Sequence, residues 1–328
     1  MHQIISKKLG RWVRILAVSI LFLTVFVLIL FGVSYLFMPK NNLAEFGMED
    51  VTANGILGER DNSIDVLVIG DSEAYSAISP MEIWQKQGIT SYVCATSGQK
   101  LSASDTFLKQ AFKRQKPKVV ILETDAIYRD IPANDAILTR IQNLFSVFRY
   151  HNRWKTLRSD ELFTSVEYTW TDDHKGFVYN GAINGTDNTE YMIPTDSAAP
   201  IKALNQQYVK AMAAYCKANG ATFLLVSTPS TVNWNYERHN GVAQLADSCG
   251  VTYIDLNLAP NKVDIDWSTD TRDKGDHLNY NGAVKVSAWL GEYLKEHFDL
   301  SDHREDSDYS KWNEALTRYQ KAVTPAAT

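Results

Sequence analysis

The sequence of 328 residues is poor in cysteine. Its 3 cysteines, Cys94, Cys216 and Cys249, are too few and odd in number for a disulfide framework to be the main staple of a domain. Cys94 lies in a strand-like run and Cys216 in a helix-like run, so we expect both to be small buried apolar residues. A Cys216–Cys249 disulfide stays open. No cysteine lies near a histidine at a spacing typical of zinc sites.

Clusters of Lys and Arg are also missing. The formal net charge of -5 and the sequence pI near 5.8 argue against a protein that binds phosphate backbones, so we expect no nucleic-acid partner. No Gly-x-Gly-x-x-Gly or Walker-type loop follows the first predicted strand, which disfavours a nucleotide-binding protein. The acidic residues between Asp264 and Asp276 fail the EF-hand spacing, because Thr269 stands where Gly is required. We therefore expect neither a metal nor a cofactor.

What the sequence does contain is a long apolar run near its start. No side chain from Ile15 to Met38 is charged, and about 24 residues at roughly 1.5 Å each span roughly 36 Å, enough to cross a bilayer core. Basic residues precede the run and only Lys40 follows closely, so the positive-inside rule places residues 1–14 in the cytoplasm. The run is too long for a cleaved signal peptide and lacks a small-x-small cleavage site. We therefore expect a signal anchor at 15–38 in the cell membrane, with the rest of the chain extracytoplasmic.

Short apolar runs and helix-like stretches alternate after a linker expected at 39–60. The apolar runs are rich in β-branched residues, as in strands buried on both faces of a parallel sheet, and lie at 64–70, 91–95, 118–123, 222–227 and 252–256. The helix-like stretches lie at 101–115, 201–218, 239–248 and 283–298. This alternation predicts right-handed βαβ units and a three-layer α/β/α sandwich with a mainly parallel sheet over residues 61–300.

Two segments depart from the alternation. Residues 130–200 are rich in aromatic and turn residues and predict an insertion or lid within the domain. Residues 301–328 begin with many charges and end in a short Ala/Thr/Pro stretch, which predicts a solvated helix followed by a frayed tail.

The first candidate for chemistry is Ser72, in Gly70-Asp71-Ser72 directly after the first predicted strand. Ligands of open α/β sheets bind outside the carboxyl ends of the strands. A serine there, before a helix, exposes its hydroxyl and offers its own N–H to an oxyanion. Taken alone the tripeptide is weak, because a serine at such a junction is most often a helix N-cap.

A histidine near the far end of the chain supplies the partner that Ser72 needs. His277 lies in a polar, Asp-rich loop before the last helix, and it becomes a base if a carboxylate orients its ring. Asp273 stands four residues before it and Asp276 one residue before it. A bulged loop would bring Asp273 to the imidazole, so we narrowly favour Asp273 and leave both open. His239, which also follows a strand end, is the best rival base.

Together these segments resemble the SGNH (GDSL-like) hydrolase superfamily, whose sequence blocks appear here in order. The resemblance spans about residues 60–298 and rests on Gly70-Asp71-Ser72, Ser97-Gly98, Thr124-Asp125 after the third strand, Asp276-His277-Leu278-Asn279 and Gly282. It implies an SGNH/flavodoxin-like fold and a Ser72–His277–Asp acyl-enzyme mechanism. It also implies that Gly98 and the third block supply oxyanion donors.

The chain departs from this pattern at two positions. The third block usually supplies an Asn side chain, and Asp125 stands in its place. An ionised carboxylate repels an oxyanion, and losing one donor costs roughly 2.7–4 kcal/mol, so Thr124 or a backbone N–H is the expected substitute. The pattern also puts an Asp three residues before the histidine, where this chain has Lys274.

More narrowly, the chain resembles membrane-anchored SGNH proteins of bacterial envelopes, such as the D-alanine transfer protein of teichoic-acid D-alanylation and the alginate O-acetylation proteins. The resemblance implies a serine esterase or O-acyltransferase that acts on envelope polysaccharide or teichoic acid beside a membrane-bound O-acyltransferase. Hydrolysis and transfer both stay open. The alternative is a catalytically weak SGNH-like scaffold that binds envelope polymer or the membrane acyltransferase, which the changes at Asp125 and Lys274 favour.

Overall fold

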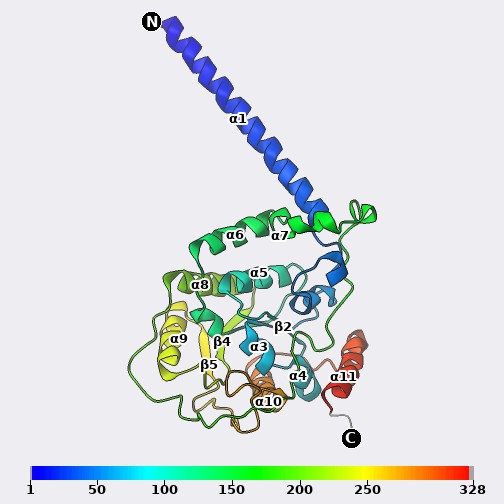
Figure 1. Cartoon of the computed structure of the whole chain (residues 1–328), viewed down its shortest axis with the longest axis vertical. Helices are drawn as coiled ribbons and strands as arrows, with labels where there is room; N and C mark the ends of the chain where they lie inside the picture. The colour runs from blue at the N-terminus through cyan, green and yellow to red at the C-terminus, as the bar shows by residue number, and fades with distance from the viewer. Residues whose placement is uncertain (1, 325–328) are drawn as a thin grey trace. The chain divides into compact units, whose positions relative to one another are not determined.

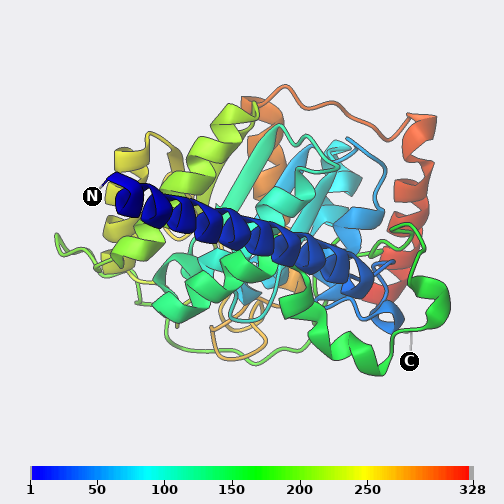
Figure 2. The same cartoon turned by 90° about the horizontal axis from the view of Figure 1, so that it is seen from above.

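The computed structural model describes residues 2–324, which divide into two compact units (Figures 1 and 2). One unit combines the N-terminal residues up to Met48 with 134–167, and the other combines 49–133 with the chain from Tyr168 onward. The tail expected to fray falls partly on residues 325–328, which lie outside the described residues.

The N-terminal unit is built on one long helix, α1 (His2–Phe37), drawn in blue in Figure 1. Its stretch Gly10–Phe37, 28 residues with a mean hydropathy of 3.0, is long and apolar enough to cross a membrane. None of its most apolar 18-residue window is buried inside the protein. By length, composition and position the helix fits a membrane anchor or a signal sequence.

The interval expected to be a single insertion, 130–200, is divided between the two units. Its first part carries the helices of the N-terminal unit, namely α6 (Ala133–Leu144), α7 (Val147–Tyr150), η4 (His151–Lys155) and η5 (Ser159–Glu161), beside η1 (Ala44–Phe46). Its second part, from Tyr168 on, belongs to the larger unit and has no helix or strand before α8. The prediction of one insertion within the domain was therefore wrong.

The larger unit has a five-stranded parallel sheet in the order β2-β1-β3-β4-β5. The strands are β1 (Val66–Gly70), β2 (Ser91–Ala95), β3 (Val119–Glu123), β4 (Thr222–Ser227) and β5 (Thr252–Asp255). This is the flavodoxin-like order of doubly wound sheets, in which ligands bind at the point where the strand order reverses. The predicted α/β sandwich is confirmed, and every predicted strand is present.

Helices cover both faces of the sheet, as Figure 1 shows. One layer contains α3 (Ser72–Ala77), α4 (Pro80–Gln87) and α10 (Tyr280–His297). The other contains α5 (Leu101–Ala111), α8 (Ala203–Ala218) and α9 (Tyr236–Cys249). The core between the first layer and the sheet includes Val66 and Val68 of β1 with Val286 and Leu290 of α10, all fully buried. Burial on both faces explains why the strands read as continuous apolar runs.

Part of the segment expected to be a linker is folded into the larger unit. Residues after Glu49 form α2 (Val51–Asn54) and η2 (Gly55–Gly58). Ile56 and Leu57 are only 2% and 3% exposed. The expectation of a linker through residue 60 was therefore wrong, because this part of the chain is helical and its apolar side chains are buried.

The C-terminal helix is not solvated on all sides. After η6 (Ser307–Tyr309), α11 (Ser310–Val323) buries Trp312 and Tyr319, and its other face is charged. The Trp312 ring lies 5.2 Å from the ring of Trp84 on α4. The Tyr319 hydroxyl hydrogen-bonds Ser79 at 2.9 Å. The helix predicted from the charged sequence is thus a structural part of the larger unit.

Truncation of Trp312 tests this packing. We expect Trp312→Ala to lower the free energy of unfolding by about 3–5 kcal/mol, the usual cost of removing a buried Trp, in denaturant titrations of the full chain in detergent. Lys311→Ala, at the exposed neighbouring position, should change it by less than about 0.5 kcal/mol. Equal midpoints for the two variants would show that α11 is not part of the cooperative core.

Candidate active site

The candidate residues gather at the carboxyl edge of the sheet. All strands are parallel, so the segments that follow Gly70, Glu123 and Ser227 emerge on the same side. β1 lies between β2 and β3, which makes the β1–β3 edge the switch point of the strand order. Gly70 is required there, since a Cβ would lie 2.7 Å from the Cβ of Glu123. Ser72 therefore follows the strand at the position where such sheets bind ligands.

Ser72 is the first residue of α3 and is not its N-cap. The cap is Asp71, whose carboxylate accepts a 3.0 Å hydrogen bond from the N–H of Glu73. A role as helix N-cap, the simplest structural explanation for a serine at this position, is therefore excluded for Ser72. As the first helical residue, Ser72 has no intrahelical acceptor for its N–H. That N–H and the helix dipole both favour an anion at this point.

The loop before α10 holds His277 by the carboxylate of Asp273. Asp273 Oδ2 lies 2.7 Å from His277 Nδ1, and Oδ1 accepts a 2.6 Å hydrogen bond from the His277 N–H. Lys274 and Gly275 have φ of 63° and 88°, which forms the bulge that lets an Asp four residues before the histidine reach it. Asp276 is farther, with Oδ2 3.6 Å from Nδ1. The imidazole is thus fixed through Nδ1, which leaves Nε2 as its second nitrogen.

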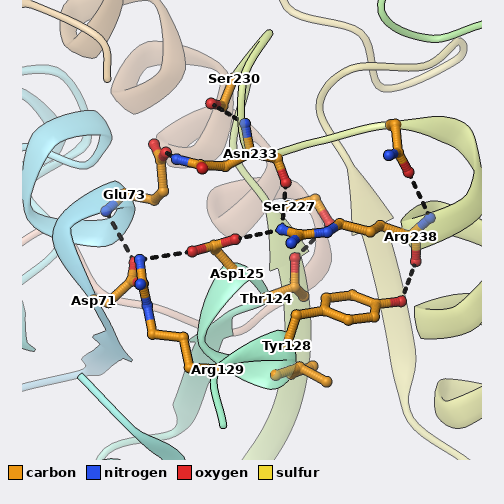
Figure 3. Close-up of polar contacts among 12 residues, drawn as sticks. Asp71, Glu73, Thr124, Asp125, Tyr128, Arg129, Ser227, Ser230, Asn233 and Arg238 are labelled. Carbon is orange, nitrogen blue, oxygen red and sulfur yellow. Dashed lines mark hydrogen bonds and ion pairs between the residues drawn. The ribbon is translucent and has the colours of Figure 1, made fainter. Parts of the chain in front are cut away.

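The two distant ends of the domain meet at Glu73, the residue after Ser72. Side-chain oxygens of Glu73 and Asp276 and a ring nitrogen of His277 lie within 4.8 Å of one another. Asn233, in the loop after β4, links two of them: its Nδ2 lies 2.7 Å from Glu73 Oε1 and 2.5 Å from Asp276 Oδ1. Figure 3 shows Glu73 and Asn233 pointing toward each other. The fold therefore brings the start of α3 beside the histidine loop.

The same three ligand atoms are close enough to contact one small cation. However, the Asn233 amide already donates hydrogen bonds to both carboxylates. The amide N–H groups therefore satisfy the carboxylate oxygens that a cation would otherwise bind. The set also contains only one imidazole and no cysteine, unlike the usual transition-metal sites. We assign no metal to it.

Asp125 is held between two guanidinium groups, as Figure 3 shows. Arg129 Nη2 lies 2.8 Å from one carboxylate oxygen and Arg238 Nη1 lies 2.7 Å from the other. Arg129 also pairs with Asp71, so the clamp extends to the cap of α3. Both carboxylate oxygens of Asp125 are thus occupied by guanidinium groups, so this side chain is not placed to donate to an oxyanion. The prediction that Asp125 belongs to the oxyanion donors was therefore wrong. Through Arg129, Asp125 instead links the end of β3 to the cap of α3.

Thr124 does not replace the missing donor. It is fully buried, and its hydroxyl lies 2.6 Å from the hydroxyl of Ser227. The hydroxyl is therefore committed to the interior, and the expectation that Thr124 serves the oxyanion was wrong. Gly98 differs, because it is exposed after β2 with φ of 61° and nothing lies within 4 Å of a Cβ built on it. Only the N–H groups of Ser72 and Gly98 remain from the predicted set.

No protein-family model matches the chain, and no curated protein matches it. One similar solved structure is a protein assigned to the G-D-S-L lipolytic family of Desulfitobacterium hafniense DCB-2, with 12% identity, 71% of this chain and 100% of that chain covered, and a TM-score of 0.40. The lipase/acylhydrolase from Enterococcus faecalis has 8% identity, coverage of 73% and 99%, and a TM-score of 0.38. A GDSL-like lipase from Bacteroides thetaiotaomicron VPI-5482 has 11% identity, coverage of 71% and 88%, and a TM-score of 0.35.

The chain is similar to GDSL-type hydrolases. This is the group that the sequence blocks resembled. At TM-scores below 0.5 the likeness is a general one, and what the candidate site can do follows from the contacts of this chain's own residues.

Buried carboxyl groups surround Ser72 and the residues beside it. Burial, and the Asp125 carboxylate nearby, raise the pKa of Asp71 to about 6, although Arg129 acts in the opposite direction. Burial and neighbouring carboxylates also hold the pKa of Glu73 and of Glu123 well above the ordinary range. For both groups the raised pKa favours the protonated, neutral form.

Glu73 is the residue that sequence reasoning missed. It is 1% exposed, and its Oε2 has no hydrogen-bond partner among the described residues. As a neutral acid it can donate one hydrogen bond into the space beside His277. The only signal in the sequence was a charged residue in an otherwise uncharged first turn, directly after the candidate nucleophile.

The rival base His239 has a carboxylate of its own. Its Nδ1 lies 2.8 Å from Asp255 Oδ2, and the Trp234 indole N–H donates to the same oxygen at 3.0 Å. Although burial alone would raise it, the pKa of Asp255 is lowered by hydrogen bonds from His239, Asn257 and Trp234. The His239–Asp255 pair joins α9 to β5, whereas His277 lies beside Glu73, the residue that follows Ser72. All three cysteines are free thiols, so the disulfide left open from the sequence does not form here.

Proposed function

We propose that the chain is a serine esterase or O-acyltransferase in which Ser72 is the nucleophile, His277 the base and Asp273 the residue that orients the base. One observation carries the proposal: His277, whose ring Nδ1 and backbone N–H both hydrogen-bond the carboxylate of Asp273, lies beside the residue that follows Ser72. A serine at a sheet switch point, next to a carboxylate-oriented histidine, is the arrangement that acyl transfer requires.

The reaction proceeds through an acyl-enzyme. His277 Nε2 takes the proton of the Ser72 hydroxyl while Oγ attacks the ester or thioester carbonyl. The N–H groups of Ser72 and Gly98 stabilise the oxyanion, and the leaving alcohol or thiol departs with the proton from His277. Water or a sugar or polyol hydroxyl then attacks the acyl group, and His277 takes and returns the second proton. Water as the acceptor makes the protein an esterase, and a hydroxyl makes it a transferase.

The proposed setting is the outer face of the cell membrane. The apolar helix ending at Phe37, preceded by basic residues, supports a signal anchor with a cytoplasmic N-terminus. The substrate would then be an acyl group of envelope polysaccharide or teichoic acid, and a membrane-bound O-acyltransferase would be a suitable partner. These assignments come from the resemblance of the sequence blocks to membrane-anchored SGNH proteins.

Labelling with a fluorophosphonate tests the chemistry. We expect the full chain in detergent to be labelled, Ser72→Ala to lose the label completely, and Ser76→Ala, on the same helix and buried, to keep it. Labelling should be unchanged by EDTA, because no step uses a metal. A folded wild-type chain that is not labelled would contradict the proposal and favour the scaffold that binds polymer or a membrane acyltransferase.

A further inference from the structure

Helices α6 and α7 carry an apolar stripe that the described residues of the protein do not cover. Ile137, Leu138, Ile141, Leu144 and Phe148 recur at helical spacing along one side of the segment. Their side chains are between 40% and 59% exposed. A row of large exposed apolar side chains on a surface helix indicates contact with another apolar phase.

Positive charge accompanies this stripe. The segment from Arg140 to Arg158 contains five basic residues, and no acidic residue stands between Asp135 and Asp160. Arg153 and Arg158 pair with Glu161, so Arg140, Arg149 and Lys155 supply the positive charge beside the stripe. Trp154 in the same segment is 66% exposed. Apolar residues on one side, basic residues beside them and an exposed Trp are typical of helices that lie in the interface of a bilayer with anionic lipids.

The segment is attached to the outer end of α1, within the same compact unit. The ring of Phe145 lies 5.0 Å from the ring of Phe31, and Ser146 Oγ donates to the Ser34 carbonyl at 3.0 Å. Farther on, Arg153 Nη1 donates to the carbonyls of Phe37 and Met38 at 2.8 and 2.9 Å. Figure 1 shows α7 at the foot of α1 and α6 running away from it.

These contacts fix the depth of the segment relative to the apolar helix. Phe31 precedes the end of α1 at Phe37 by about 9 Å of helix, at roughly 1.5 Å per residue. Phe145 is thus held at the depth of Phe31, which is farther along α1 toward the apolar run than the end of the helix at Phe37. Interfacial helices bury their apolar side about 5–10 Å into the boundary between headgroups and acyl chains.

We propose that α6 and α7 form an in-plane membrane helix that lies in the outer leaflet beside α1, with the stripe from Ile137 to Phe148 in contact with lipid. The inference rests on the membrane anchoring stated under the proposed function. The protein therefore contacts the bilayer along two elements. A single crossing helix can rotate and tilt, whereas a crossing helix with an attached in-plane helix has a fixed orientation toward the membrane surface.

Environment-sensitive labels test the inference in the full chain. Single cysteines replace Leu138, Ile141, Asn143 or Phe22 in a Cys249→Ser background, since Cys94 and Cys216 are buried. Each variant is labelled with NBD and reconstituted in phosphatidylcholine vesicles with 30% phosphatidylglycerol and lipids that carry a doxyl quencher. We expect the labels at 138 and 141 to shift to the blue and to be quenched at least twofold more than the label at 143, on the opposite side of α6. Phe22, inside the apolar run of α1, is the reference for a lipid environment.

The outcomes separate this inference from the anchor itself. A quenched label at 22 with water-like emission at 138 and 141 would overturn the in-plane helix and leave the anchor intact. Labels at 138 and 141 that become protected only when a membrane-bound O-acyltransferase is added would also overturn it, because the occupant would then be a protein. An unquenched label at 22 would reject the anchor, and with it the membrane placement of α6.

Discussion

Replacing Asp273 by Asn is expected to slow the acylation of Ser72 on the order of 10³- to 10⁴-fold, the scale seen when the orienting carboxylate of a serine triad loses its charge. Both oxygens of Asp273 are bonded to His277, one to the ring and one to the backbone. An Asn at this position cannot accept the Nδ1–H and keep the backbone bond with the same atoms. The imidazole then loses both its tautomer preference and the stabilisation of its charged form.

Asp276→Asn is the matched control for this prediction. Its Oδ1 is held by Asn233 at 2.5 Å and its Oδ2 lies 3.6 Å from the histidine nitrogen, so we expect less than about a tenfold loss. The measurement is the second-order rate constant for fluorophosphonate labelling from pH 5 to 9. A larger loss in Asp276→Asn than in Asp273→Asn would reverse the assignment.

Replacing Glu73 by Gln is expected to stabilise the protein as the pH rises. The carboxyl group of Glu73 is fully buried with a raised pKa, so the folded state keeps its proton while the unfolded state loses it above about pH 4.5. From there up to the folded-state pKa, wild-type stability falls by about 1.4 kcal/mol per pH unit because of this group. The Gln variant has no such loss, so the two stabilities coincide below pH 4 and diverge above it.

Urea titrations of Glu73→Gln and wild type between pH 4 and 8 measure this difference. Glu292→Gln, at an exposed position, should follow wild type at every pH. Labelling of Ser72 should persist in Glu73→Gln at neutral pH, because a neutral amide replaces a neutral acid of the same shape. Parallel stability curves for Glu73→Gln and wild type would mean that Glu73 is ionised in the folded protein.

The sheet could be predicted from the sequence because each strand is buried on both faces. Residues 119–122, for example, are all apolar, as expected of a strand that helices cover on both sides. Ser72 and His277 could be selected because parallel strands deliver their loops to a single edge. The contact between Asp273 and His277 follows from the bulge at Lys274 and Gly275, which the sequence indicates only through Gly275.

Other features depended on partners that the sequence does not reveal. Asp125 occupies the position of an oxyanion donor, and only the structure shows Arg129 and Arg238 on either side of it. Neither Arg has a spacing that singles it out. Residues 134–167 read as part of an insertion in the α/β domain, yet they form one compact unit with α1, where Phe145 packs against Phe31. In both cases the local sequence describes only one of the two partners in a contact, whereas the role of the residue depends on both partners.

The central claim is that one hydroxyl and one imidazole, far apart in the chain, act as a unit. Tandem mass spectrometry of the fluorophosphonate-treated full chain tests this most directly, since it locates the phosphonyl group on a single residue. The account predicts a phosphonyl group on Ser72 in wild type and none at matched exposure in His277→Gln. A phosphonyl group on another serine such as Ser227, or equal modification of Ser72 with and without His277, would contradict it.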